Sequence, residues 1–363
     1  MSKLAADADG GVARTTYIAN VALGLVIGVA GGALANWLRL PLAWMIGAMV
    51  FTTIAAMAKA PVTMPRSARG VMVAVLGVML GAAFSPEMAA RVTNWWPTLL
   101  ALALYCAAIT GSLMLYFHMV AGHDWVTSYF SAAPGGLNEM VVVGGEMGGD
   151  ERTISLVHGS RVLLVVLVIP FGFVLMGDYD QSARPPLGDS IASMTSADLA
   201  ILGACGVFGA FGARALRIPA AYVTGPMLLS AIAHLTGLTA SKPPSELVAL
   251  AQVVIGIAVG SRFAGVSPAR VARTLIEAVG STTIMLIVTV LFALALEPLA
   301  ATSFAALVLS FAPGGLAEMS LIALALGIDA AFVSTHHIMR IIMVVIAAPL
   351  LFRLIRRRQI KSK

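Results

Sequence analysis

The chain has 363 residues, of which 59% are hydrophobic and 11% are charged, and its formal net charge is +6. Soluble domains carry about 25% charged residues, so this chain cannot cover its outside with polar groups, and lipid must surround much of it. Six of the 23 cationic residues occupy positions 353–363, directly after an apolar run. That placement is typical of a cytoplasmic helix end and argues against a direct nucleic-acid partner.

Apolar runs near the roughly 20 residues that span a bilayer follow one another along the chain. We expect an N-terminal tail at 1–16 that is retained, not a cleaved signal peptide, because it has acidic residues and no charged start. A first membrane repeat at 17–176 has apolar runs at 17–35, 41–58, 68–84, 97–117 and 153–176. A polar linker at 177–197 follows. The second repeat, 198–354, has runs at 199–213, 218–235, 247–261, 274–296, 303–326 and 331–352, and a basic cytoplasmic tail closes the chain at 355–363.

The two halves repeat one another at an offset of 179 positions. Residues 133–140 read Ala-Pro-Gly-Gly-Leu-Asn-Glu-Met, and residues 312–319 read Ala-Pro-Gly-Gly-Leu-Ala-Glu-Met. Other pairs matched at this offset are Ser131 with Ser310, Asp150 with Asp329, Ser155 with Ser334, His158 with His337, Arg161 with Arg340, Pro170 with Pro349, Gly77 with Gly256 and Gly81 with Gly260. A duplicated, very hydrophobic chain is typical of secondary transporters.

The orientation of the halves depends on whether each Pro-Gly-Gly segment crosses the membrane. With Arg161 and Arg340 set aside as intramembrane, crossing segments put 13 cations inside and 8 outside, whereas re-entrant segments put 17 inside and 4 outside. The positive-inside rule favours the second arrangement. We therefore predict an all-α polytopic membrane protein with two inverted repeats, about ten transmembrane helices and two broken, re-entrant segments.

The paired breaks are the predicted binding site. Proline and paired glycines interrupt a helix, and irregular backbone at membrane depth is tolerated only where protein buries it or a watery cavity touches it. A half-helix should start after each break, with Glu139 or Glu318 in its first turn. Each glutamate either caps its own half-helix or binds the coupling ion, H+ or Na+. The break residues of the predicted site are Ser131, Pro134, Gly135 and Gly136, with Ser310, Pro313, Gly314 and Gly315.

The helix after each break adds His158 and Arg161 in one half, and His337 and Arg340 in the other. A spacing of three puts these side chains on one helix face. Two interpretations stay open. The arginines form structural ion pairs, Arg161 with Glu139 or Asp150 and Arg340 with Glu318 or Asp329, or they bind an anionic substrate such as a carboxylate while the histidines shuttle protons. Asp150 and Asp329 follow glycine-rich turns and are expected to cap helices.

The sequence lacks the motifs of metal binding, phosphate binding and nucleophilic catalysis. No His, Cys or carboxylate cluster has metal-ligand spacing, no phosphate-binding loop is present, and no nucleophile elbow stands out. The two cysteines, Cys106 and Cys205, lie in apolar runs and read as packing residues. We expect no catalytic residues, no cofactor, no metal site and no enzyme activity.

The duplicated Ala-Pro-Gly-Gly-Leu-X-Glu-Met motif and the matched Asp, His and Arg positions resemble the AbrB family of duplicated bacterial inner-membrane proteins, over nearly the whole chain. This is not the small soluble DNA-binding regulator of the same name. Family members carry labels such as transcriptional regulator or ammonia monooxygenase. The first hypothesis is an inner-membrane secondary transporter or exporter of a small anionic solute, with its C-terminus in the cytoplasm. The alternative is a membrane scaffold or sensor that regulates gene expression indirectly. An ammonia monooxygenase is disfavoured because clustered histidines are missing, and assembly as a homo-oligomer stays open.

Overall fold

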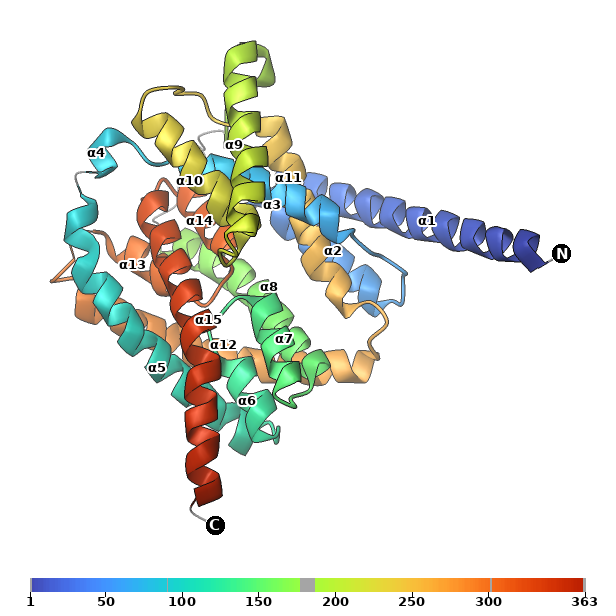
Figure 1. Cartoon of the computed structure of the whole chain (residues 1–363), viewed down its shortest axis with the longest axis vertical. Helices are drawn as coiled ribbons and strands as arrows, with labels where there is room; N and C mark the ends of the chain where they lie inside the picture. Colours follow the sequence, from blue (N-terminus) through green and yellow to red (C-terminus); the bar gives the residue numbers. More distant parts are fainter. Residues whose placement is uncertain (1, 90, 177–186, 301, 362–363) are drawn as a thin grey trace.

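A computed structural model describes residues 2–89, 91–176, 187–300 and 302–361, and these residues form helices and connecting loops, with no β-strand among them. Part of the expected linker, 177–186, lies outside the described residues. Figure 1 shows the two ends of the chain far apart, with α1 leaving the body on one side and α15 on another. The expected all-α class is confirmed.

Each half is built from the same series of helices. The first half contains α1 (Ser2–Trp37), α2 (Ala43–Met57), α3 (Arg66–Gly81), α4 (Pro86–Ala89), the 3-10 helix η1 (Val92–Trp95), α5 (Trp96–Met119), α6 (Trp125–Ala132), α7 (Leu137–Glu146) and α8 (Glu151–Leu175). After η3 (Ile191–Ser193), the second half contains α9 (Ser196–Ala215), α10 (Ala221–Leu235), α11 (Ser245–Gly260), η4 (Ser261–Phe263), α12 (Pro268–Leu296), α13 (Phe304–Phe311), α14 (Leu316–Ala325) and α15 (Ala330–Lys361). Helices α6, α7 and α8 begin 179 residues before α13, α14 and α15.

The structure is that of a polytopic membrane protein. In the described part of the chain, α1, α5, α8, α9, α11, α12 and α15 contain the seven segments long and apolar enough to cross a bilayer. Adding α2, α3 and α10, which have 15, 16 and 15 residues, gives five pairs of equivalent helices. Large apolar side chains on α5, α9 and α12 point outward, among them Leu104, Phe208 and Ile276, which are 67%, 70% and 73% exposed. Lipid is the solvent that such faces require.

The tight connection before α2 recurs before α10. Arg39 and Arg217 have φ angles of 56° and 55°, in the left-handed region that non-glycine residues rarely adopt. Leu42 and Ala220 follow with φ angles of 46° and 52°. The same left-handed backbone conformation therefore occurs in both halves. The duplication is visible in the backbone as well as in the matched sequence motifs.

Helices of the two halves pack directly against one another. Helix α3 packs against α10, and α11 packs against α2. Gly77 and Gly81 of α3 lie against the carbonyl groups of Val223 and Met227, and Gly256 and Gly260 of α11 lie against those of Met45 and Met49. A side chain at any of these glycines would meet backbone, so the glycines allow the close approach that stabilises helix pairs in lipid.

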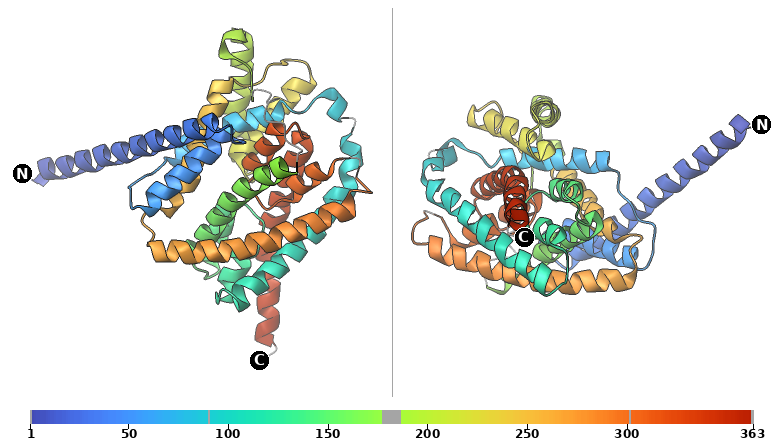
Figure 2. Two further views of the ribbon diagram at one scale, coloured as in Figure 1. Left: turned by 180° about the vertical axis from the view of Figure 1, so that it is seen from behind. Right: turned by 60° about the horizontal axis from the view of Figure 1, so that its bottom comes forward.

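Helix α5 shows that the halves are inverted. At its start, Trp95 packs edge-on against Phe332 with ring centroids 5.4 Å apart, and Thr98 Oγ1 lies 2.9 Å from Nε2 of His336, so α15 begins there. At its other end, His123 lines the same pocket as Asp150, so α8 begins there. Because the equivalent helices α8 and α15 start at opposite ends of α5, the repeats run in opposite directions. Figure 2 shows α5 and α12 crossing the same side of the molecule.

The broken segments enter and return on the same side. The Asp150 amide, directly before α8, donates to Thr127 Oγ1 in the first turn of α6 at 2.9 Å. Between the two helices, Gly144 in the last turn of α7 lies against the side chain of Phe130 of α6. The segment is therefore a re-entrant hairpin, as predicted. In the second half the expected apolar run 303–326 is likewise two helices, α13 and α14, with the break between them.

Candidate functional site

The helices that follow the two breaks carry Arg161 and Arg340 at about half the depth of a bilayer. Arg161 and Arg340 each follow the first residue of their helix, Glu151 and Ala330, by ten positions, 161 − 151 and 340 − 330. Ten helical residues rise about 15 Å, half of the roughly 30 Å hydrocarbon core. Both arginines are buried, with 5% and 3% of their surface exposed.

A histidine holds each re-entrant hairpin to the helix that follows it. Nε2 of His158 lies 2.9 Å from the Phe130 carbonyl, and Nε2 of His337 lies 2.9 Å from the Leu309 carbonyl. Carbonyl oxygen only accepts, so in both rings Nε2 carries the proton. Both histidines are fully buried. They fix the last turns of α6 and α13, a positioning role that the sequence left undecided against proton transfer.

Arg340 closes the second hairpin. Its Nη1 donates to the Ala312 carbonyl at 2.6 Å, and its Nη2 donates to the Gly314 carbonyl and to Nδ1 of His337, both at 2.9 Å. Helix α13 ends there with its partial negative pole, so a cation is favoured. Arg340 is thus a clamp on the broken backbone.

Arg161 occupies the equivalent position but has different surroundings. Its Nε and Nη1 atoms are buried and have no hydrogen-bond partner among the described residues. The three ion pairs in the described part of the chain involve neither Arg161 nor Arg340, so the predicted pairs with Glu139, Asp150, Glu318 and Asp329 are wrong. The aspartates instead begin helices: Asp150 accepts from the amide of Arg152, and Asp329 accepts from the amide of Phe332.

Each glutamate after a break folds back over the glycine that starts its half-helix. A Cβ built on Gly136 would overlap Oε2 of Glu139, and one built on Gly315 would overlap Oε2 of Glu318. The carboxylates therefore lie at the positive N-terminal poles of α7 and α14, as a capping role requires. Glu139 is partly exposed, whereas Glu318 is buried at 7% exposure and interacts electrostatically with Arg262.

The remaining break residues form the tips of the hairpins. Ser131, Pro134, Ser310, Pro313 and Gly314 are buried, and Gly135 lies close to Val344 of α15. The hydroxyls of Ser131 and Ser310 have no partner among the described residues. Unpaired buried hydroxyls cost free energy unless a ligand or water reaches them.

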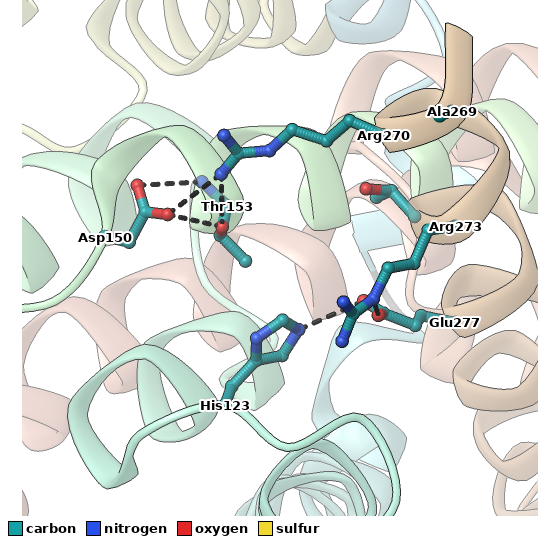
Figure 3. Close-up of a pocket in the computed structure, with 8 residues that line it drawn as sticks. His123, Asp150, Thr153, Ala269, Arg270, Arg273 and Glu277 are labelled. Atoms are coloured by element: carbon teal, nitrogen blue, oxygen red, sulfur yellow. Dashed lines mark hydrogen bonds and ion pairs between the residues drawn. The ribbon is translucent and has the colours of Figure 1, made fainter. Parts of the chain in front are cut away.

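Two sets of polar residues were missed by the sequence analysis. Near the centre, the Tyr105 hydroxyl lies 3.0 Å from Thr289 Oγ1, and Tyr105 interacts electrostatically with Arg161 and Arg340. At one end of the body, charged residues of both halves line a pocket (Figure 3). Apart from Asp150, which matches Asp329, these residues carry no repeated motif, so only the fold brings them together. In the described part of the chain, no three His, Cys, Asp or Glu side chains gather as a metal site would require.

Comparisons with known proteins agree with this architecture. A family model described as "Transition state regulatory protein AbrB" matches residues 44–356. The chain belongs to the AbrB family. One AbrB-family relative is "Uncharacterized protein YhjN" of Bacillus subtilis (strain 168), 29% identical over 91% of this chain and 92% of the relative. Another is "Putative regulator AbrB" of Escherichia coli (strain K12), 26% identical over 87% of this chain and 91% of the relative.

Proposed function

We propose that this AbrB-family protein is a secondary transporter of a small anionic solute, with the site between the two breaks. The observation that carries the proposal is Arg161, a buried guanidinium at mid-membrane depth whose Nε and Nη1 have no partner among the described residues. An unpaired buried charge is very costly, and an intramembrane arginine normally faces a partner or a watery path. A carboxylate matches its forked donors.

The surroundings of Arg161 support an anion in particular. Arg161 and Arg340 repel one another, and neither forms an ion pair among the described residues. The N-terminal poles of α7 and α14 add partial positive charge beside the breaks. Inverted repeats with paired broken helices are the architecture in which alternating access exposes one midplane site to each side in turn. Transport of this kind needs no catalytic residue, cofactor or ATP.

Basic residues gather on the face where α8 and α12 begin. Arg152 donates to the Gly265 carbonyl, and Arg270 and Arg273 belong to the first turns of α12. Helix α15 runs the opposite way to α8, so the basic C-terminal segment ends on this face too. By the positive-inside rule this face is cytoplasmic, in a bacterial inner membrane.

Anion binding by purified protein tests the proposal. We would measure thermal unfolding in detergent with and without acetate, lactate, succinate, inorganic phosphate and sulfate. A ligand at 100 times its Kd stabilises the folded state by about 2.7 kcal/mol. At least one carboxylate should raise the midpoint for the parent protein. Arg161→Gln should fold with equal or higher stability and lose that rise, because it removes an uncompensated charge together with the receptor.

Arg340→Gln is the matched comparison. It removes bonds to the α13 carbonyls, so it should lower the midpoint without ligand. Anion stabilisation unchanged by Arg161→Gln, or absent from the parent with every anion, would contradict the proposal. For an anion that binds, uptake into proteoliposomes should be abolished in the double variant Glu139→Gln, Glu318→Gln, which leaves folding intact. Normal uptake by that double variant would remove the glutamates from the site.

The name of the Escherichia coli relative favours a second candidate, a membrane scaffold or sensor that regulates gene expression indirectly. In that case the repeated polar residues are structural. No solute would move across a proteoliposome membrane, and removal of either Arg161 or Arg340 would disrupt the assembled protein. Equal loss of stability in Arg161→Gln and Arg340→Gln therefore favours this candidate over the transporter.

A further inference from the structure

A polar pocket of about 510 Å³ lies on the seam between the halves, at the end of the body where α8 and α12 begin. Figure 3 shows its charged side chains converging from opposite walls. The loop after α5 and the start of α8 supply one wall, and the first turns of α12 supply the other. The charged or titratable lining residues are His123, Asp150, Arg270, Arg273 and Glu277.

Two ion pairs join the halves across this pocket. Nε2 of His123 lies 3.0 Å from Oε2 of Glu277, and Nη2 of Arg270 lies 3.1 Å from Oδ2 of Asp150. Arg273 strengthens the first pair, because its Nε contacts Oε1 of Glu277 at 2.9 Å and its Nη2 donates to the Ala121 carbonyl at 3.2 Å. Any motion that opens the seam on this face must break these contacts.

Buried polar residues continue inward along α12 from Glu277. Glu277 is 8% exposed, and Ser281 and Thr289 further along the helix are 1% and 0% exposed. Thr289 bonds Tyr105, which interacts with both central arginines. On α8, the pocket residue Thr153 and the buried Ser160 are seven residues apart and share a face. Buried polar residues on membrane helices mark solute and proton paths.

We propose that the His123–Glu277 pair is a proton-binding site that controls access from this face to Arg161. The proposal rests on the proposed transport function and adds a proton as the species that regulates opening. With the proton bound, imidazolium and carboxylate form a charged bridge and the seam stays closed. When water takes the proton from the ring, a hydrogen bond from the neutral imidazole to the carboxylate remains, the attraction between opposite charges is lost, and this face opens.

Histidine is the side chain that changes charge near neutral pH, and His123 is the histidine among the residues that line this pocket. Partial burial acts to raise the pKa of Asp150, but hydrogen bonds from Thr153 and from backbone amides, together with Arg270, hold this pKa below its ordinary value. Asp150 therefore stays ionised from pH 6 to 8. Groups facing the pair are His118 and Tyr116 on α5, Asp124 before α6, Asp150 before α8, and Arg270 and Arg273 on α12.

A buried cysteine reports the opening without any solute. In a background lacking Cys106 and Cys205, Ser160→Cys would be reacted with a charged methanethiosulfonate reagent at pH 6 and pH 8 in lipid nanodiscs. Its rate is divided by that of Ala58→Cys, an exposed residue at the end of α2, to remove the intrinsic pH dependence of thiols. Histidine side chains lose their charge between about pH 5 and 8, so the normalised rate should rise about fourfold between pH 6 and pH 8.

Variants separate the proton site from a general loosening of the protein. His123→Gln should give a normalised rate independent of pH, and Glu277→Gln should react fast at both pH values. His118→Gln, the matched control in the last turn of α5, should keep the fourfold change. An unchanged pH response in His123→Gln, or slow reaction in Glu277→Gln, overturns the proposal. A flat response in the parent also overturns it, whereas anion stabilisation through Arg161 is a separate result that tests the transport function.

Discussion

Arg161 and Arg340 occupy equivalent positions, yet among the residues that the structure describes Arg340 is bonded to the broken backbone, whereas Nε and Nη1 of Arg161 have no partner. The sequence predicts that both are intramembrane and share a face with His158 or His337, because spacing along a helix decides that. It could not predict which arginine keeps free donors, because the partner of a long side chain is set by tertiary packing. The predicted ion pairs failed for the same reason: Asp150 is near in sequence, but Arg270 reaches it from the other half.

The glycine before each half-helix, Gly136 or Gly315, leaves room for the carboxylate of Glu139 or Glu318. A single substitution at Gly136 tests whether this space is needed. Gly136→Ala places a Cβ where Oε2 of Glu139 lies. Overpacking of this kind costs about 1–3 kcal/mol. We expect a lower midpoint of thermal unfolding in detergent and, for an anion that the parent transports, reduced uptake.

The control for that substitution is Gly172→Ala on α8, where a new Cβ meets no heavy atom within 4 Å. Alanine there should match or raise the stability of the parent, because it favours helix by about 1 kcal/mol. Equal stability of Gly136→Ala and Gly172→Ala would show that Glu139 moves freely and that the glycine has no such role.

Whole helices were predicted well from hydropathy, because a lipid-facing helix must be apolar along its length. The sequence placed spans at 41–58 and 218–235, and the structure has α2 and α10 there. The re-entrant path of α6 and α7 was reached only through charge counting, since eight- and ten-residue helices carry no spanning signal of their own. The packing of α3 against α10 could not be predicted. Glycine spacing indicates which face of a helix is in close contact, but it does not indicate which other helix makes the contact.

Close approach of helix pairs gives a test at the level of elements. Gly225 of α10 lies against the Gly209 carbonyl of α9, and a Cβ there would also lie 2.6 Å from the Cβ of Ala213. Gly225→Ala should push the two helices apart and lower the free energy of unfolding by about 2 kcal/mol. Gly203→Ala, on α9 with open space around the new Cβ, is the control and should not destabilise. Denaturant unfolding in mixed micelles measures both, and equal values would contradict the close packing.

At the scale of the molecule, inverted repeats place equivalent loops on opposite sides of the membrane, so the two sides can differ in charge. The first turn of α3 carries Arg66 and Arg69, which interact electrostatically with Arg262 in η4, directly after α11. The opposite end is less basic: the linker residue Asp189 bonds the Lys242 amide beside the start of α11. Charge counting could detect this asymmetry from sequence because orientation depends on lysine and arginine in short loops. It could not place the pocket between the halves, whose residues come from helix ends far apart in the chain.

Equivalent positions on opposite sides of the membrane provide the sharpest test of inversion. Ala58 and Thr236 are the exposed residues that end α2 and α10, so they match one another in the two halves. With Cys106 and Cys205 replaced, Thr236→Cys should react with an impermeant maleimide in intact cells, and Ala58→Cys only after permeabilisation. Parallel halves would place both cysteines on one side and give the same result for each. Opposite sides with the order exchanged would keep the inversion and put the C-terminus outside, and the pocket of His123 and Glu277 would then sense external pH.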